Sequence, residues 1–134
     1  MASAPVPPRT WTLRIRAADA PIFRALATGE KAIETRAGSA AARSVATARP
    51  GDILLFLCGP ERLRRRVLRV ARYPSVDALL AGEDFRRIAP WLADPADLAA
   101  LYAGFAGYPQ RIARYGLVAL ELAPADVTPG PSLA

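Results

Sequence analysis

The sequence predicts an α+β fold, in which a small mixed β-barrel of about five to six strands carries short helices packed against its outside. Three observations lead to this prediction. Apolar runs of strand length recur along the chain, helical spacing of apolar residues is confined to short pieces, and the strands outnumber parallel crossover units. A length of 134 residues suits one domain with a single core.

The first part of the chain predicts a strand, a short helix and a second strand. Residues 11–16 alternate between apolar and polar side chains, as in a half-buried strand. Asp19 is a plausible helix N-cap, and Gly29 stands where a left-handed C-terminal residue is wanted. Residues 31–36 then predict a strand with Ile33 pointing inward and, on its other face, Ala32, Glu34 and Arg36.

The middle of the chain predicts a loop followed by two strands. Residues 37–50 are mostly small and polar, which indicates a mobile loop. Residues 53–57 form a continuous apolar run, typical of a central strand. In residues 63–72 the apolar side chains change phase, which indicates either a bulge or burial on both faces of a strand.

The last third predicts three helical pieces and a closing strand. The first piece is a turn capped by Ser75, and the second is a short helix over residues 83–88. A stronger helix begins at residues 94–97 and is ended by Gly107 and Pro109. Residues 115–122 predict the final strand, with alternate apolar residues on one side.

Composition and chain ends set the expected organisation and location. We expect a folded domain over residues 10–123 between disordered tails over residues 1–9 and 124–134. No apolar run approaches the roughly 18 residues of a membrane span, and the N-terminus lacks the pattern of a secretory signal. The single cysteine, Cys58, excludes an internal disulfide and predicts a cytoplasmic protein without a disulfide-linked partner. The oligomeric state is left open.

The absence of histidine limits the kinds of catalysis and metal binding that the chain can support. It removes the usual general base, the serine-type triads and the commonest zinc ligand. Catalysis would have to use lysine, carboxylates, tyrosine or hydroxyl side chains. We therefore expect no metal site and no cofactor.

One lysine stands out among the basic residues. The chain has 18 lysine and arginine residues, and Lys31 is the only lysine. The two side chains differ where a compact, titratable amine is needed, so a lone lysine beside Glu34 and Arg36 is a candidate for chemistry. Alternatively, Lys31 is an exposed strand residue that escaped replacement by arginine.

The arginines predict either a nucleic-acid-binding surface or an ordinary solvated face. The pI is about 10.4, and arginines crowd residues 62–72, including Arg64 and Arg66. Arg43 adds charge in the predicted loop. Because an arginine-rich composition raises the pI without any selection for binding, charge alone leaves both interpretations open.

Several segments together resemble the ASCH domain, a branch of the PUA-like β-barrel folds. The resemblance covers roughly residues 11–122, in the order expected of the family. It rests on the segments Gly29–Arg36 and Gly51–Phe56, Arg43, Val67 with Val70 and Tyr73, Leu79-Leu80 with Glu83, and Tyr115–Leu120.

The resemblance implies a PUA-like barrel with a charged cleft between barrel and helices, and RNA or nucleosides as ligands. Some similar proteins resemble amidohydrolases that deacetylate N4-acetylcytidine with a lysine, a threonine three residues later and a glutamate. Lys31 matches the lysine, and Glu83 is an approximate match for the glutamate. Glu34 stands at the threonine position, so the chain departs from the amidohydrolase pattern there.

Two main functions follow as hypotheses. The first is recognition of RNA or a modified nucleoside, with the cleft receiving a base and arginines contacting phosphates; its ligand-binding candidates are Arg36, Arg43, Arg64, Arg66, Tyr73 and Tyr115. The second is a nucleoside amidohydrolase with Lys31, Glu34 and Glu83 as catalytic residues and Glu83 facing Lys31. Glu83 could instead be a first-turn acid that complements a helix dipole. Weaker alternatives are a small-anion or protein-binding module and a metal-dependent ribonuclease.

Overall fold

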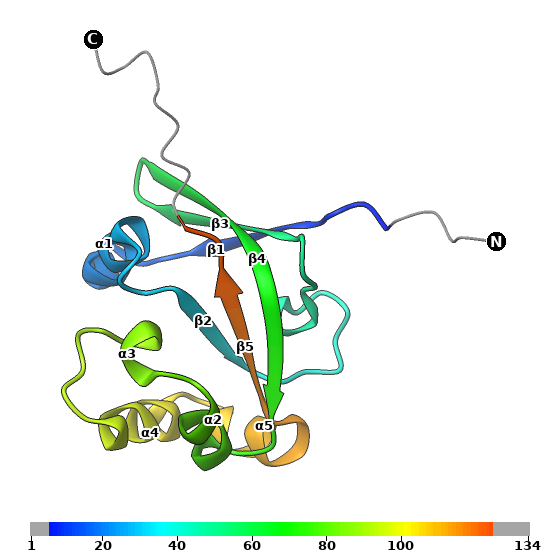
Figure 1. Ribbon diagram of the computed structural model, residues 1–134, viewed down its shortest axis with the longest axis vertical. Coiled ribbons are helices and arrows are strands. Elements are labelled where there is room, and N and C mark those ends of the chain that lie inside the picture. Colours follow the sequence, from blue (N-terminus) through cyan, green and yellow to red (C-terminus); the bar gives the residue numbers. More distant parts are fainter. Residues whose placement is uncertain (1–5, 125–134) are drawn as a thin grey trace, which may run out of the picture.

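Five strands form one mixed sheet that curls into a half-barrel, with short helices gathered at one end (Figure 1). The computed structural model describes residues 6–124. The order of the strands in the sheet is β1-β3-β4-β5-β2, and this confirms the predicted α+β class with a mixed sheet. The strands are β1 (Thr10–Arg14), β2 (Ile33–Ala37), β3 (Ile53–Cys58), β4 (Glu61–Tyr73) and β5 (Leu117–Leu122).

The long strand β4 joins the two halves of the sheet. Its first half pairs with β3 and its second half with β5, both antiparallel, while β1 pairs with β3 in parallel. The register shifts between Val67 and Arg69, so a bulge, the first of the two alternatives that the change of phase left open, is present. A bulge bends a strand and increases its twist, which lets one strand serve two differently oriented halves.

A first core fills the concave side of the sheet. Helix α1 (Ala20–Thr28) packs Phe23 and Leu26 against it, and Gly29 ends this helix with a φ of 86°, in the left-handed region. The segment predicted as a loop contributes as well. Its second half contains the 3₁₀ turn η2 (Val45–Thr47), which is capped by Ser44. The small side chains of that segment therefore belong partly to the core rather than to an exposed loop: Val45, Ala46 and Ala48 are buried.

A second core lies between the sheet and the helices α2 (Val76–Gly82), α3 (Phe85–Ile88), α4 (Pro95–Gly104) and α5 (Tyr108–Tyr115). The sequence did not predict α5, because Gly107 and Pro109 were interpreted only as the end of the preceding helix. Gly107 instead takes a φ of 78° as the N-cap of α5, and the proline occupies its first turn. Proline suits that position because the first-turn N–H groups lack helical partners.

Asp52 ties the N-terminal strand to the turn before β3. Its carboxylate accepts hydrogen bonds from the Trp11 Nε1–H at 2.9 Å and from the backbone N–H groups of Arg9 and Arg49 at 2.9 and 3.0 Å. Arg9, the last residue of the predicted N-terminal tail, also places its guanidinium 4.1 Å from the centre of the Trp11 ring. Residues 1–5 and 125–134 of the predicted tails lie outside the described residues. Between residues 6 and 124, no helix is long and apolar enough to cross a membrane.

We expect Asp52→Asn to lower the free energy of unfolding by about 1–3 kcal/mol at neutral pH, because it weakens one buried and two part-buried charge-assisted hydrogen bonds. Burial raises the pKa of Asp52, but its three N–H donors and Arg9 outweigh that effect and hold the pKa below its ordinary value. Its ionised form therefore stabilises the fold fully above the unfolded pKa of about 3.9, and this stabilisation is lost as the pH falls through the lower folded pKa.

Urea denaturation of wild type and variant at several pH values measures both effects. The difference should shrink below about pH 4. Glu61→Gln, at an exposed hairpin position, is the matched control and should change stability by less than about 0.5 kcal/mol. A pH-independent difference between wild type and Asp52→Asn would contradict the assignment.

Candidate functional site

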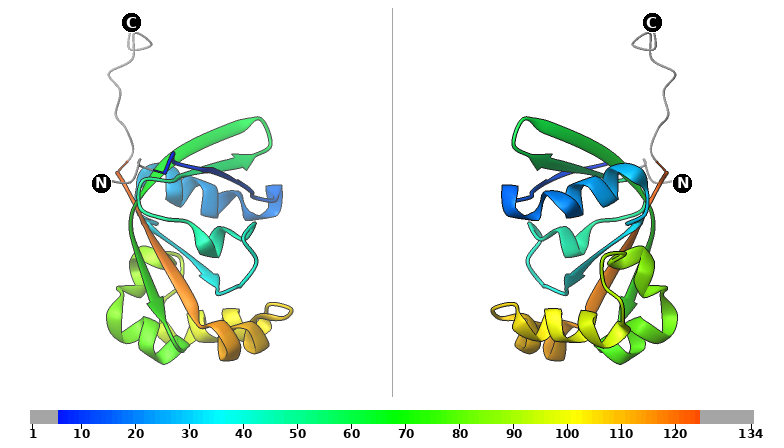
Figure 2. Two further views of the ribbon diagram at one scale, coloured as in Figure 1. Left: turned by 90° about the vertical axis from the view of Figure 1, so that its right-hand side faces the viewer. Right: turned by 90° about the vertical axis from the view of Figure 1, so that its left-hand side faces the viewer.

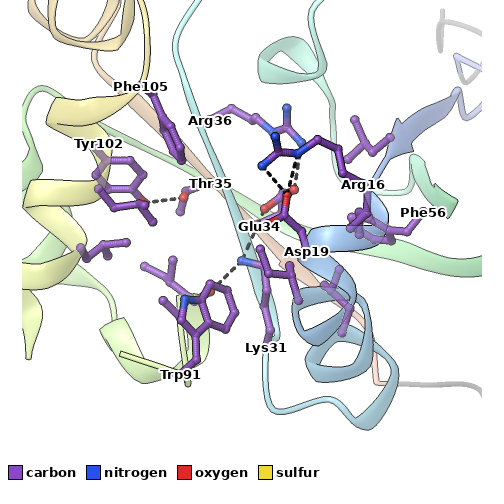
Figure 3. A pocket seen from close by; sticks show the side chains of 18 of the residues that line it. Arg16, Asp19, Lys31, Glu34, Thr35, Arg36, Phe56, Trp91, Tyr102 and Phe105 are labelled. Atoms are coloured by element: carbon purple, nitrogen blue, oxygen red, sulfur yellow. Dashed lines mark hydrogen bonds and ion pairs between the residues drawn. The ribbon is translucent and has the colours of Figure 1, made fainter. Parts of the chain in front are cut away.

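A cavity of about 420 Å³ lies between the half-barrel and the helical layer (Figure 3). Strand β2 crosses it, with α1 and the end of β1 on one side and α4 on the other. The polar and aromatic residues of its lining include Arg14, Arg16, Lys31, Glu34, Thr35, Arg36, Trp91, Tyr102 and Phe105.

Backbone contacts on both sides fix Lys31 at the start of β2. Its N–H donates to the carbonyl of Ala25 in α1 at 3.0 Å, and the next N–H, of Ala32, donates to the carbonyl of Arg87 in α3 at 2.8 Å. The bend after Gly29 thus brings the chain between two helices before β2 begins. It turns the lysine side chain into the protein rather than along the strand.

The Lys31 ammonium has three acceptors. Its Nζ donates to the carbonyl oxygens of Ile33 and Ile88 at 2.8 and 2.7 Å, and it lies 3.4 Å from a Glu34 carboxylate oxygen. The residue is 5% exposed. Burial lowers the pKa of Lys31 and outweighs the opposing effect of Glu34, and Arg36 lowers it further, so the net pKa lies below its ordinary value. Two hydrogen-bonded carbonyls and a neighbouring carboxylate surround the amine, a geometry that suits the charged form.

Glu34 lies between two cations. Its second carboxylate oxygen accepts from the Arg36 Nη2–H at 3.1 Å, and its side chain is 14% exposed. Burial raises the pKa of Glu34, but Lys31 and Arg36 together outweigh it, so the net pKa is lowered and the carboxylate is ionised at neutral pH. The structure therefore brings together Lys31, Glu34 and Arg36. The alternation along the strand predicted one shared face for Glu34 and Arg36, whereas Lys31 joins them through the bend that precedes β2.

The free edge of β2 also faces this cavity. Ala32 and Gly38 bond to β5, so the register leaves the backbone groups of residues 33, 35 and 37 on the other side. The carbonyl of Ile33 accepts from Lys31, and that of Ala37 accepts from the Arg111 Nη2–H at 3.0 Å. The N–H and C=O of Thr35 lie between these two contacts, beside Glu34.

Aromatic side chains form the opposite wall. Trp91 is 43% exposed, and its ring centre lies 5.9 Å from the Lys31 Nζ; Phe105 is 42% exposed. The hydroxyl groups of Tyr102 and Thr35 are hydrogen-bonded to each other. Trp91 lies in the segment between α3 and α4. Tyr102 and Phe105 fall at helical spacing with Leu98, a pattern typical of core packing, and no sequence pattern singles out Thr35.

Glu83 does not face Lys31, contrary to the amidohydrolase hypothesis. Its carboxylate accepts two hydrogen bonds from Arg69, at 2.9 and 2.7 Å, and one from the Tyr73 hydroxyl. Arg69 and Arg87 also pair with Glu121 on β5. These ion pairs join α2 and α3 to the outside of the sheet, so Glu83 and Tyr73 have a structural setting away from the cavity.

The remaining predicted ligand residues also lie outside the cavity lining. Arg43 is exposed in the loop after β2, and Tyr115 is 41% exposed at the end of α5 with Arg114 against its ring. Arg64 and Arg66 lie on the exposed face of β4. Within residues 6–124, no cluster of three or more carboxylate or cysteine side chains is arranged to hold a metal ion.

Comparison with known proteins shows a shared fold. No protein-family model matches the chain, and no curated protein matches it. The crystal structure of the archaeal hypothetical protein PH0355 is similar, with a TM-score of 0.69 and 25% identity over 84% of this chain and 96% of that one. The solution structure of protein PF0455 from Pyrococcus furiosus has a TM-score of 0.67 and 23% identity, covering 87% of this chain and 98% of that one.

We expect Lys31→Met to lower the free energy of unfolding by about 3–5 kcal/mol, because it leaves the buried Glu34 carboxylate with one cation and removes two bonds to carbonyls. Adding Glu34→Gln should recover part of that loss. In a double-mutant cycle followed by urea denaturation, the coupling between the two residues should be about 2 kcal/mol. Strictly additive effects would show that the pair does not interact as described.

Proposed function

We propose that the cavity binds a nucleobase, presented by a modified nucleoside or by an exposed position of RNA. One observation carries the proposal: an ionised carboxylate, held by a lysine and an arginine, lies opposite exposed aromatic rings in a cavity of about 420 Å³. That volume falls in the usual range of small-molecule sites, about 300–1,000 Å³.

Each polar group has a role in such a complex. Glu34 accepts from an exocyclic amine or ring N–H of the base, while the backbone N–H and C=O of Thr35 offer a donor and an acceptor side by side. The half-exposed Arg36 has further N–H groups for a carbonyl or a phosphate. The Trp91 ring offers a face for stacking, worth about 1–3 kcal/mol per base in other proteins.

The resemblance to the ASCH family supports the same proposal. The segments that carry it include Lys31, Glu34 and Arg36, and these residues meet in the cavity. The fold shared with PH0355 and PF0455 is consistent with it, although their names state no function.

Hydrolysis of N4-acetylcytidine is the second candidate, because Lys31 and a carboxylate do lie in contact in a cavity. A lysine that attacks or activates water needs a free lone pair. The three acceptors of Lys31 and the distant placement of Glu83 favour a positioning role for this lysine, so we place binding ahead of catalysis.

Nucleoside binding can be followed by the fluorescence of Trp91, because the only other tryptophan, Trp11, is buried away from the cavity. We expect at least one of the four common ribonucleosides or N4-acetylcytidine to quench it saturably. Glu34→Gln should weaken that binding by about tenfold or more, because a carboxylate is replaced by a neutral amide. Glu61→Gln, on the β3–β4 hairpin, should bind like wild type.

Trp91→Phe should remove most of the fluorescence change. If no nucleoside binds the folded wild type, or if Glu34→Gln binds as tightly as wild type, the proposed site is wrong.

Incubation with N4-acetylcytidine separates the two candidate functions. We expect chromatography to show no release of cytidine, because the Lys31 amine is engaged by two carbonyls and Glu34, and Glu83 lies outside the cavity lining. Turnover by wild type that disappears in a folded Lys31→Arg variant would instead establish the amidohydrolase.

A further inference from the structure

The arginines of β4 divide into two sets by strand parity. Arg65 points inward, where its guanidinium donates to the carbonyls of Leu26 and Ala27 at the end of α1, both at 3.3 Å. Arg69, beyond the bulge, is held by Glu83 and Glu121. Both arginines have structural partners. The outward set lies before the bulge and consists of Arg62, Arg64 and Arg66, all exposed.

The strand register places the outward set on one continuous face. Arg62, Arg64 and Arg66 lie opposite Leu57, Leu55 and Ile53 of β3, which in turn lie opposite Arg14, Thr12 and Thr10 of β1. None of these nine positions is acidic. We call this face the arginine face. Helix α1 lies on the other side of these strands, and within the described part of the chain no helix covers the arginine face (Figure 2).

The four arginines of this face lie together without a neutralising carboxylate among the described residues, and this grouping, rather than the lack of ion pairs alone, sets them apart from single exposed arginines such as Arg24 and Arg86. Within residues 6–124, no ion pair joins Arg14, Arg62, Arg64 or Arg66 to a carboxylate. By contrast, the arginines at the cavity and on the β4–β5 surface have acidic partners: Arg16, Arg36, Arg69 and Arg87. Unpaired cations on one exposed sheet face create a positive potential that attracts a polyanion.

The arginine face begins at the cavity. Arg14 lines the cavity and also shares a row with Leu57 and Arg62. Two strand spacings separate Arg14 from Arg62, about 10 Å, and four residues separate Arg62 from Arg66, about 14 Å. A flexible chain that leaves the cavity at Arg14 would therefore meet three further arginines within the length of a few nucleotides.

We propose that the arginine face binds the phosphodiester backbone of single-stranded RNA, next to the nucleotide whose base enters the cavity. The inference rests on the proposed function for the position of that base. Beyond that function, the inference identifies the polymer that binds, the surface to which it binds and the residues that contact it. A single strand fits because it can bend from the cavity mouth onto the sheet while leaving one base unstacked.

Fluorescence anisotropy with a labelled ten-nucleotide single-stranded RNA of mixed sequence tests this inference. The test variant replaces Arg62, Arg64 and Arg66 by glutamine. The control replaces Arg24, Arg72 and Arg86, three exposed arginines off this face, and it changes the net charge equally. We expect the test variant to bind RNA at least tenfold more weakly than the control variant does at about 50 mM salt.

The salt dependence provides a second readout. Each phosphate neutralised on a single strand contributes about 0.7 to the slope of log K against log salt, so the slope should fall by about 2 in the test variant. The quenching of Trp91 by a free nucleoside should not change. The single variant Arg64→Gln should show a smaller loss in the same direction, and circular dichroism verifies that each variant is folded.

The possible results test the arginine face and the proposed cavity site separately. If test and control variants lose RNA affinity equally, or if wild type binds no RNA, the arginine face is not the site. If a duplex of the same sequence binds as tightly as the single strand, the inferred ligand is wrong. RNA binding that depends on the arginine face, with no nucleoside binding in the cavity, would support the face and overturn the proposed function.

Discussion

The buried ammonium of Lys31 is the interaction on which the cavity depends. It bonds the start of β2 to the end of α3 and holds Glu34 in place. A buried charge must be paired and fully hydrogen-bonded, or its desolvation destabilises the fold. Satisfying this one group therefore fixes the distance between the half-barrel and the helical layer, and the space left between them is the candidate site. An arginine would not replace it, because a planar fork cannot direct its donors at three acceptors around one nitrogen.

Much of the fold could be predicted from local patterns. Alternation identified β1, β2 and β5, a continuous apolar run identified β3, and the change of phase in residues 63–72 marked the bulge of β4. The errors came from residues that serve more than one role. Gly107 and Pro109 suit the end of one helix and the start of another equally well. Small side chains such as Ala46 suit either a loop or a tight place in a core, and only tertiary packing decides between them.

The candidate site was predictable only where it lies on one element. Lys31, Glu34 and Arg36 are close in sequence, and strand geometry brings the last two to one face. Glu83 illustrates the limit. Its partners Arg69 and Tyr73 are 14 and 10 residues away, and their approach depends on how β4 bends after the bulge. The contribution of Tyr102 and Phe105 to the aromatic wall was also hidden, because helical spacing describes which residues share a face but not whether that face meets a core or a cavity.

The contacts along the free edge of β2 have a consequence for solubility. An unpaired strand edge is a template onto which a strand of another molecule can add. Here Lys31 and Arg111 occupy the first and third of the outward carbonyls, those of Ile33 and Ala37, and Thr35 between them keeps both backbone groups for a ligand. An incoming strand would have to displace two cations to form a ladder. The edge can thus receive one small planar group while resisting the edge-to-edge association that leads to aggregates.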